Sequence, residues 1–206
     1  MEWALLKKGL APVCGIDEAG RGPLAGPVVA AAVLLNAHDL PDGIADSKKL
    51  SAAARAHLCK ELHRRAHVGV GQATAAEIDA LNIHHATLLA MRRAFDDLCA
   101  ALERAGAPCA PAFALVDGKF APDLPCGAQA VVKGDAKVLS IAAASIVAKH
   151  HRDVLMTELD ERYPGYGFAQ HKGYPTKIHL QALERLGPCP EHRRGYAPVR
   201  RVCEGG

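Results

Sequence analysis

The sequence predicts an α/β domain with a mixed β-sheet. Apolar runs typical of strands come first, and amphipathic helical stretches then alternate with further short strands, the order expected for helices packed on a sheet. Half of the 206 residues are hydrophobic, which is ample for a core. For a chain of this length we expect a single domain over residues 1–206, with a C-terminal helical and loop extension from about residue 160.

Two apolar runs begin the predicted sheet, and a glycine-rich turn joins them. Residues 11–16 and 28–35 have the composition of strands, and we interpret them as a hairpin-like pair with a wide connection. Ser51 is a favourable N-cap for an alanine-rich helix that runs to about residue 65. Residues 68–74 alternate in character, which predicts a third strand.

Helical patterns dominate the rest of the chain. Thr74 is expected to cap a short helix over 75–81, and a longer amphipathic helix follows at about 83–104. The elements expected next are strands at 112–116 and 128–132, a helix at 138–162, a glycine- and aromatic-rich loop at 164–175 and a helix at 176–186. The tail from Gly187 is rich in proline and arginine, and we expect it to be irregular.

Composition argues against a membrane protein and against a disulfide framework. The seven cysteines are odd in number and scattered, and they form no C-x-x-C pair, a distribution typical of reduced thiols. The N-terminus has no signal-peptide pattern, and the apolar run at 28–35 is too short to cross a bilayer. We therefore expect a cytoplasmic protein with no membrane partner. The net charge of +3 permits nucleic-acid binding without indicating it.

Four acidic residues stand at the ends of predicted elements: Asp17 and Glu18 after the first strand, Asp117 after a later strand, and Asp135 before the long helix. Carboxylates favour hard divalent cations, and two such ions about 4 Å apart are typical of phosphodiester hydrolysis. Adjacent strand residues point to opposite faces, so the Asp–Glu pair reaches one site only if the strand ends, bulges or admits one acid from the side. The alternatives are a solvated strand end and, for Asp135, a favourable interaction with the helix dipole.

Histidine pairs offer a weaker alternative for metal binding. His63 and His67 lie four residues apart, but they adjoin two arginines and are better interpreted as part of a solvated face. We interpret the histidine pairs at 84–85 and 150–151 in the same way.

Basic residues form three clusters that suit phosphate positioning and equally suit solvated loops. The clusters are Arg21 in the glycine-rich turn, Lys48 with Lys49 in a loop, and Lys172 with Lys177 around Tyr174. Tyr174 lies in the sequence HKGYPT, where the adjacent glycine and proline define the backbone. It suits stacking on a sugar or base, a hydrogen bond to a phosphate, or a structural role as a buried loop anchor.

These motifs together resemble the signature of bacterial ribonuclease HII. The resemblance covers nearly the whole chain in the order of the family, and only the stretch from about Val199 has no counterpart. The matching motifs are GIDEAGRGPLAGPV at 15–28, DSKKL at 46–50, VDG at 116–118, KGD at 133–135, AAASIVAK at 142–149, YPGYGF at 163–168 and HKGYPT at 171–176.

The resemblance implies a ribonuclease H-like fold, which is a mixed five-stranded sheet flanked by helices with a small helical C-terminal part. It implies a monomeric endonuclease that cleaves the RNA strand of RNA–DNA hybrids and cuts on the 5′ side of single ribonucleotides embedded in DNA. The products carry 5′-phosphate and 3′-hydroxyl ends. It also implies two-metal catalysis with Mg²⁺ or Mn²⁺, the ligands and catalytic residues being Asp17, Glu18, Asp117 and Asp135.

The resemblance also implies a set of substrate contacts. Gly20, Arg21 and Gly22 would line the side of the ribonucleotide that carries the 2′-hydroxyl, which distinguishes RNA from DNA. The remaining contacts would be Tyr174 stacked on the following deoxyribose, and Lys48 and Ser145 on phosphate or backbone groups. Because glycine lacks a Cβ and allows close approach, we expect a bulky residue at Gly20 or Gly22 to damage ribose recognition more than folding.

Two other functions are the alternatives to this interpretation. A two-metal nuclease of this fold acting on another nucleic acid needs the carboxylates but not the glycine–arginine–glycine turn or the Tyr174 loop. A non-catalytic hybrid-binding module is expected to lose one or more of the acids, whereas all four are present here.

Overall fold

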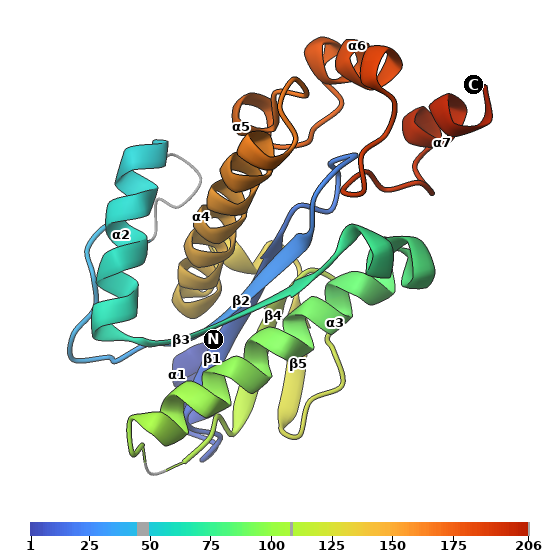
Figure 1. Ribbon diagram of the computed structural model, residues 1–206. Helices are drawn as coiled ribbons and strands as arrows, with labels where there is room; N and C mark the ends of the chain where they lie inside the picture. Colours follow the sequence, from blue (N-terminus) through green and yellow to red (C-terminus); the bar gives the residue numbers. More distant parts are fainter. Residues whose placement is uncertain (45–49, 108, 206) are drawn as a thin grey trace.

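A five-stranded mixed sheet runs through the centre of the molecule in the order β3-β2-β1-β4-β5 (Figure 1). The strands β1 (Val13–Ala19), β2 (Val28–Leu34) and β3 (His67–Ala73) pair antiparallel in succession. On the other side of β1, β4 (Phe113–Asp117) and β5 (Gly127–Val131) run parallel to it. The predicted mixed sheet is confirmed, although β1 extends three residues beyond its expected end.

The structure is a computed structural model that describes residues 1–44, 50–107 and 109–205. Within these residues, no helix is both long enough and apolar enough to cross a membrane.

Helices cover both faces of the sheet (Figure 1). One face of β2 packs on α3 (Ala75–Arg104) through Ala30 and Ala32, while Ala31 and Val33 pack on the other side with α2 (Ala52–Arg65) and α4 (Leu139–Arg162). These four side chains are fully buried. A strand that is apolar on both faces therefore lies between two helical layers, as its unbroken apolar run predicts.

Local sequence signals set the ends of several helices. Ser51 caps α2 by accepting a hydrogen bond from Ala54 N at 3.2 Å. Thr74 and Glu77 form a capping box at the start of α3. Asn82, with φ of 65°, breaks this long element into the short and the longer helix that the sequence predicts.

The C-terminal part differs from the prediction in two places. The loop expected at 164–175 contains a short helix, α5 (Phe168–His171). The tail contains α7 (Ala197–Glu204), so the expectation of an irregular tail is wrong. A proline in the first helical turn favours the start of α7, and Val199 is buried with Leu24 and Leu183. Between them lies α6 (Lys177–Leu186), the helix expected at 176–186, and Thr176 caps its start.

Two short elements were not predicted. A helix at the N-terminus, α1 (Glu2–Leu6), contacts β1. A 3-10 turn, η2 (Gly134–Ala136), joins β5 to α4.

Glycines let α3 pack directly on the backbone of β3. A Cβ at Gly71 would lie 2.4 Å from both Ala90 O and Ala94 N, and one at Gly69 would lie 2.1 Å from Leu98 N. All these neighbours are backbone atoms, which cannot rotate away as a side chain does. The distance between strand and helix therefore depends on the absence of side chains at these two positions.

We predict that Gly71→Ala destabilises the protein, because the added methyl group must push α3 away from the sheet. The free energy of unfolding should fall by about 1–3 kcal/mol, measured by urea denaturation. The matched control is Gly195→Ala, where the nearest heavy atom to an added Cβ is 3.5 Å away and φ is not positive. Equal stability of the two variants would contradict this account of the packing.

Candidate active site

Asp17 and Asp117 stand level on neighbouring strands. β1 and β4 run parallel with Ile16 paired to Val116, so the next residue on each strand is an aspartate at the same height. Residues that stand level on parallel strands point to the same face of the sheet. On this face α4 lies over β1, and the side chain of Ser145 on α4 acts to lower the pKa of Asp17, against the larger effect of burial.

Glu18 reaches the same region because β1 loses one of its neighbours. The pairing of β1 with β4 stops at Ile16, whereas its pairing with β2 continues without a bulge from Gly15 to Ala19. Glu18 thus lies beyond the end of the β4 pairing, and its Oε1 is 3.3 Å from Nη1 of Arg21. Its Oε2 is buried and has no hydrogen-bond partner among the described residues. Of the arrangements that the sequence allowed, approach of one acid from the side fits the structure, because β1 neither ends nor bulges at Glu18.

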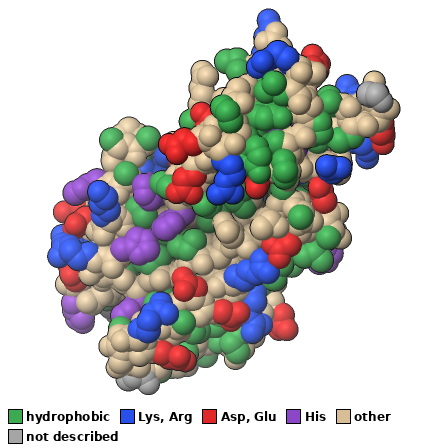
Figure 2. All heavy atoms as spheres, in the orientation of Figure 1, with side chains coloured by type: hydrophobic (Ala, Val, Ile, Leu, Met, Phe, Trp, Pro, Cys, Tyr) green, Lys and Arg blue, Asp and Glu red, His purple; other side chains and the backbone are tan. Residues whose placement is uncertain are grey.

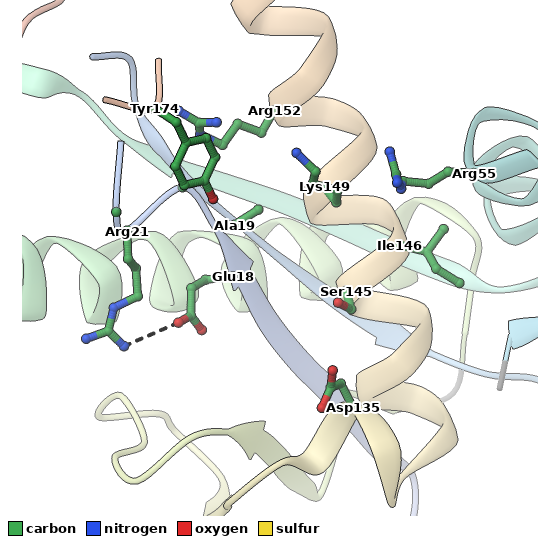
Figure 3. A pocket seen from close by; sticks show the side chains of 12 residues that line it. Glu18, Ala19, Arg21, Arg55, Asp135, Ser145, Ile146, Lys149, Arg152 and Tyr174 are labelled. Carbon is green, nitrogen blue, oxygen red and sulfur yellow. Dashed lines mark hydrogen bonds and ion pairs between the residues drawn. The ribbon is translucent and has the colours of Figure 1, made fainter. Parts of the chain in front are cut away.

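Asp135 lies in the turn that precedes α4. It belongs to η2 rather than to the first turn of α4, which begins at Leu139. The backbone N–H of Gly134 donates to Asp117 Oδ1 at 2.6 Å, so this turn is tied to the end of β4. Asp135 lines the same cleft as Glu18 and Ser145 (Figure 3). The four predicted acids thus come from β1, β4 and η2 and gather around one end of the sheet.

The carboxylates destabilise one another's charged forms. Burial raises the pKa of Asp17 well above its usual range, and the neighbouring charges of Glu18 and Asp117 raise it further. Burial also raises the pKa of Glu18, against which the guanidinium of Arg21 acts. The buried Asp17 and the half-buried Glu18 have one partly exposed arginine, Arg21, as an ion-pair partner, and a divalent cation with oxygen ligands would add the positive charge that they lack.

The cleft beside the acids has a volume of about 410 Å³ and a basic rim (Figure 3). Arg21 and Tyr174 lie on one side of it, while Lys149 of α4 and Arg55 of α2 lie on the other. Asp153 forms ion pairs with both Lys149 and Arg55, its carboxylate oxygens lying 2.6 Å from Lys149 Nζ and 3.0 Å from Arg55 Nη1. The sequence did not single out Lys149 or Arg55, because both look like ordinary exposed helix cations until α2 and α4 are packed together.

Arg152 fixes the second half of the glycine-rich turn from within α4. Its side chain is 1 % exposed, and its guanidinium donates to Pro27 O at 3.1 Å, Ala25 O at 3.2 Å and Lys172 O at 3.0 Å. Burial lowers its pKa to about 10, so it remains charged at neutral pH. The guanidinium of Arg152 therefore links α4 to both the glycine-rich turn and the Tyr174 loop.

Arg193 fixes the first half of the same turn from the C-terminal segment. It is fully buried, and its guanidinium donates to Gly20 O at 2.6 Å, Arg21 O at 3.0 Å and Gly26 O at 2.8 Å. The sequence gives no signal for this role, since Arg193 stands beside Arg194 in a basic stretch and only the tertiary contact distinguishes them.

The two glycines that flank Arg21 have different reasons to be glycine. Gly20 has φ of +99°, and a Cβ there would lie 2.1 Å from Arg152 Nε and 2.9 Å from Pro27 O. A side chain at Gly20 therefore disrupts the fold itself, and the expectation that it damages recognition more than folding is wrong for this position. Gly22 is exposed, and the nearest atom to an added Cβ is Tyr174 Cε1 at 3.6 Å.

Tyr174 is presented to the cleft by a docked loop. Leu24 N donates to Gly173 O at 2.8 Å, which joins this loop to the glycine-rich turn. The Tyr174 side chain is 44 % exposed, and its ring lies beside the glycine-rich turn that carries Arg21 (Figure 3). The part of the turn next to the ring is Gly22. It is not a buried loop anchor, so the structural alternative that the sequence left open is wrong.

The remaining predicted contact residues are scattered. Ser145 lines the cleft and lowers the pKa of the nearby Asp17. Lys172 turns away from the cleft, since its Nζ donates to Asp153 O and to the hydroxyl of Thr157, both at 3.1 Å. Lys48 lies outside the described residues.

Comparison with known proteins identifies one family. Residues 14–199 match the family model described as Ribonuclease HII. Ribonuclease HII of Parvibaculum lavamentivorans is 55 % identical over 195 residues, covering 94 % of this chain and 69 % of the relative. Ribonuclease HII of Caulobacter vibrioides is 56 % identical over 193 residues, covering 93 % and 87 %.

Solved structures show the same fold. Ribonuclease H2 of Pyrococcus horikoshii superposes with a TM-score of 0.71 at 26 % identity, covering 94 % of this chain and 97 % of that one. Ribonuclease HII of Archaeoglobus fulgidus, in a complex with PCNA, gives 0.64 at 27 % identity and covers 84 % and 86 %. A ribonuclease HIII in complex with Mn²⁺ gives 0.75 at 19 % identity, covering 93 % and 69 %, and this likeness concerns the fold alone.

We predict that Asp17→Asn stabilises the metal-free protein at neutral pH. The folded-state pKa of Asp17 lies above the ordinary value of 3.8, so the folded protein binds the Asp17 proton more tightly than the unfolded chain does. The stabilisation of the fold by protonated Asp17 is therefore complete below pH 3.8 and is lost as the pH rises through the folded-state pKa. Asparagine carries no charge, and one pKa unit corresponds to about 1.4 kcal/mol. The melting temperature in EDTA at pH 7.5 should therefore rise by about 3 °C or more.

The difference between Asp17→Asn and wild type should shrink as the pH approaches 4, and added Mg²⁺ should reduce it at pH 7.5. Asp123→Asn is the control, because it removes the same charge from an exposed side chain. A metal-free Asp17→Asn protein that melts below wild type at neutral pH would refute the crowding of charges.

Proposed function

The chain belongs to the ribonuclease HII family, hydrolases that cleave the RNA strand of RNA–DNA hybrids, and from this premise we propose a more specific activity for it. It incises duplex DNA on the 5′ side of a single embedded ribonucleotide, leaving 5′-phosphate and 3′-hydroxyl ends, with two divalent cations in the site. The observation that carries this proposal is the open backbone at Gly22, which lines the same cleft as Glu18, Asp135 and the exposed Tyr174.

The four acids suit divalent cations with oxygen ligands. Glu18 Oε2 is buried without a hydrogen-bond partner among the described residues, and burial beside other carboxylates raises the pKa of Asp17. Both features fit Mg²⁺ or Mn²⁺ held by Asp17, Glu18, Asp117 and Asp135. Bound there, such ions supply Lewis-acid chemistry, because they lower the pKa of a coordinated water and offset the negative charge of the phosphodiester.

The glycine-rich turn supplies the recognition of ribose. Arg193 and Arg152 hold its carbonyl groups from beneath, so the exposed side of the turn at Arg21 and Gly22 has a defined shape. A sugar that approaches Gly22 meets backbone rather than a side chain, which permits hydrogen bonds to its 2′-hydroxyl. Arg21 is half exposed and already paired with Glu18, so it positions an acid and faces the substrate at once.

Tyr174 supports recognition of the junction between RNA and DNA. Its exposed ring lies beside Gly22, where an added Cβ would be 3.6 Å from Cε1, so a nucleotide that enters beside Gly22 places its neighbour against the tyrosine. A deoxyribose stacks on the ring without a 2′-hydroxyl to accommodate. This pairing of an open glycine with an aromatic platform supports the proposal that one ribonucleotide followed by DNA is sufficient.

The basic rim positions the phosphate backbone. Lys149 and Arg55 lie across the cleft from Tyr174, and contacts of this kind set the register of a duplex without reading its sequence. One copy of the chain holds the acids, the turn, the tyrosine and the rim, which supports action as a monomer and as a single catalytic domain. The seven scattered cysteines suit the reducing cytoplasm.

We predict that Asp117→Asn abolishes cleavage and leaves folding intact. Asparagine keeps the Oδ1 atom that accepts from Gly134 N, while it removes the charge that the cations require. Cleavage of a labelled duplex with one ribonucleotide, in Mg²⁺ and in Mn²⁺, should fall more than about a hundredfold. The melting temperature should not decrease.

Asp123→Asn and an all-DNA duplex are the controls for this assay. Activity of Asp117→Asn above a tenth of wild type would remove Asp117 from the cation ligands. Equal cutting of the all-DNA duplex by the wild type would indicate a different two-metal nuclease, and no metal-dependent cutting at all would indicate a hybrid-binding module.

We predict that Gly22→Leu blocks incision at a single ribonucleotide while its melting temperature stays within about 2 °C of wild type. The leucine side chain projects into the exposed space that faces Tyr174 and fills the position of the sugar, without meeting the buried core. Gly22→Ala is the graded control, since a methyl group fits at 3.6 Å from the ring and should cause a smaller loss. Normal cleavage by Gly22→Leu, or its failure to fold, would contradict the role of this turn.

A further inference from the structure

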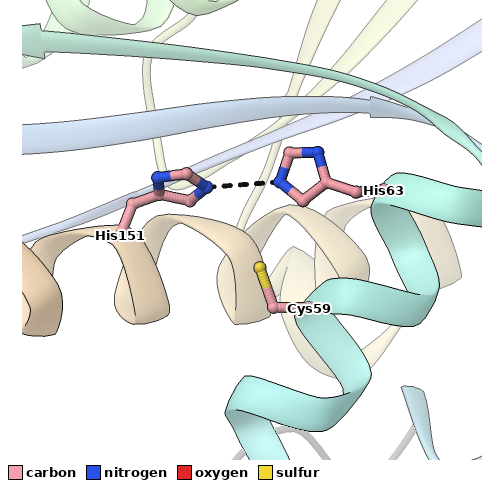
Figure 4. A group of neighbouring side chains, drawn as sticks. All are labelled: Cys59, His63 and His151. Carbon is pink, nitrogen blue, oxygen red and sulfur yellow. Dashed lines mark hydrogen bonds between the residues drawn. The ribbon is translucent and has the colours of Figure 1, made fainter.

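A second group of potential metal ligands lies between α2 and α4. Cys59 and His63 are one helical turn apart on α2, and His151 faces them from α4 (Figure 4). The Nε2 atoms of the two histidines are 3.2 Å apart, and the cysteine sulfur points toward the pair. All three ligand atoms lie within 4.8 Å of one another. The partner of His63 is therefore His151 rather than His67, the neighbour that the sequence suggests.

We propose that Cys59, His63 and His151 form a binding site for a thiolate- and imidazole-seeking cation of the Zn²⁺ type, separate from the carboxylate site. A cysteine and two histidines are typical zinc ligands, and a water molecule would complete four-coordination. The two sites call for different metals, because oxygen ligands select Mg²⁺ or Mn²⁺ whereas sulfur and imidazole select zinc.

The distances suit this chemistry with little rearrangement. In a tetrahedral zinc site with Zn–N bonds of about 2.0–2.1 Å, two imidazole nitrogens lie about 3.3 Å apart. The observed Nε2–Nε2 distance of 3.2 Å already has this value. A sulfur ligand at about 2.3 Å from zinc stands about 3.6 Å from each nitrogen, so a small approach of the Cys59 sulfur completes the site.

The surroundings favour the metal-binding form of the two histidines, whereas Cys59 must lose a proton when metal binds. Burial lowers the pKa of both His63 and His151, and neutral imidazole is the form that binds a metal. Burial raises the pKa of the Cys59 thiol to about 11, so the metal displaces one proton to solvent when the Zn–S bond forms. Cys59 is 2 % exposed, whereas His63 is exposed and gives the ion a path from solvent.

The site would cross-link two helices that serve the cleft. Figure 2 shows histidine side chains gathered on the surface over α2 and α4. α2 carries Arg55, whose ion pair with Asp153 of α4 is another contact between the same helices. Because the ion joins α2 to α4, its binding should raise resistance to unfolding.

The test is a titration of the full chain with Co²⁺, a spectroscopic substitute for Zn²⁺, with excess Mg²⁺ present to occupy the carboxylate site. We expect a thiolate-to-cobalt charge-transfer band in the near ultraviolet with one ion per chain, and displacement of the cobalt by Zn²⁺. Carboxylates cannot give this band, so it reports the cysteine ligand directly. Zn²⁺ should also raise the melting temperature of the wild type in excess Mg²⁺.

Three substitutions assign the ligands. Cys59→Ser should remove the band, while His63→Gln and His151→Gln should each weaken binding at least about tenfold. His150→Gln is the matched control, an adjacent histidine on the same helix that is outside the group of three. Because His63 is exposed, its variant should fold even if the buried Cys59 substitution does not.

A band that persists in Cys59→Ser would overturn the proposal, since it would assign the thiolate to another cysteine. A wild type without the band would also overturn it, and the contact between His63 and His151 would then be a simple hydrogen bond. Neither result bears on cleavage of ribonucleotide-containing DNA, which depends on the carboxylate site.

Discussion

Two buried guanidinium groups hold the glycine-rich turn, and the geometry of the cleft depends on them. Arg152 and Arg193 donate to the carbonyl oxygens of residues 20, 21, 25, 26 and 27, and both are almost fully excluded from solvent. A buried charge is strongly unfavourable unless hydrogen bonds compensate it, and buried carbonyl groups need donors. Here the guanidinium groups donate hydrogen bonds to the carbonyl oxygens of the turn, so the buried charges and the buried carbonyl groups satisfy one another. The turn thereby keeps an irregular path that leaves Gly22 exposed, and Arg193 joins the C-terminal segment to the turn.

The acids impose the opposite constraint. Strand register brings Asp17, Glu18 and Asp117 together, although burial and the neighbouring carboxylates raise the pKa of Asp17 and Glu18. A fold selected for stability alone has no need of such a cluster. The cluster suits the proposed cation site, because divalent cations would supply the missing positive charge. The sheet and the arginine-held turn supply stability that the cluster itself does not.

α4 connects these parts because its faces have different tasks. Its buried alanine-rich face packs on β1 and β2, Ser145 and Lys149 point to the cleft, and Arg152 supports the turn. His151 faces α2 on yet another side. Helical periodicity allows neighbouring residues to serve separate partners, so a single helix relates the acids, the rim and the interface with α2.

The sequence by itself determined the strands, the helix caps at Ser51 and Thr74, the break at Asn82 and the family, because these depend on local patterns and on motifs in a fixed order. It also placed the acids at strand ends. Only the tertiary structure decided that Gly20 is required for folding whereas Gly22 faces open space, that Arg193 is buried while Arg194 is not, and that the tail forms α7. Those features arise from contacts between segments far apart in the chain, and a single sequence carries no record of which segments meet.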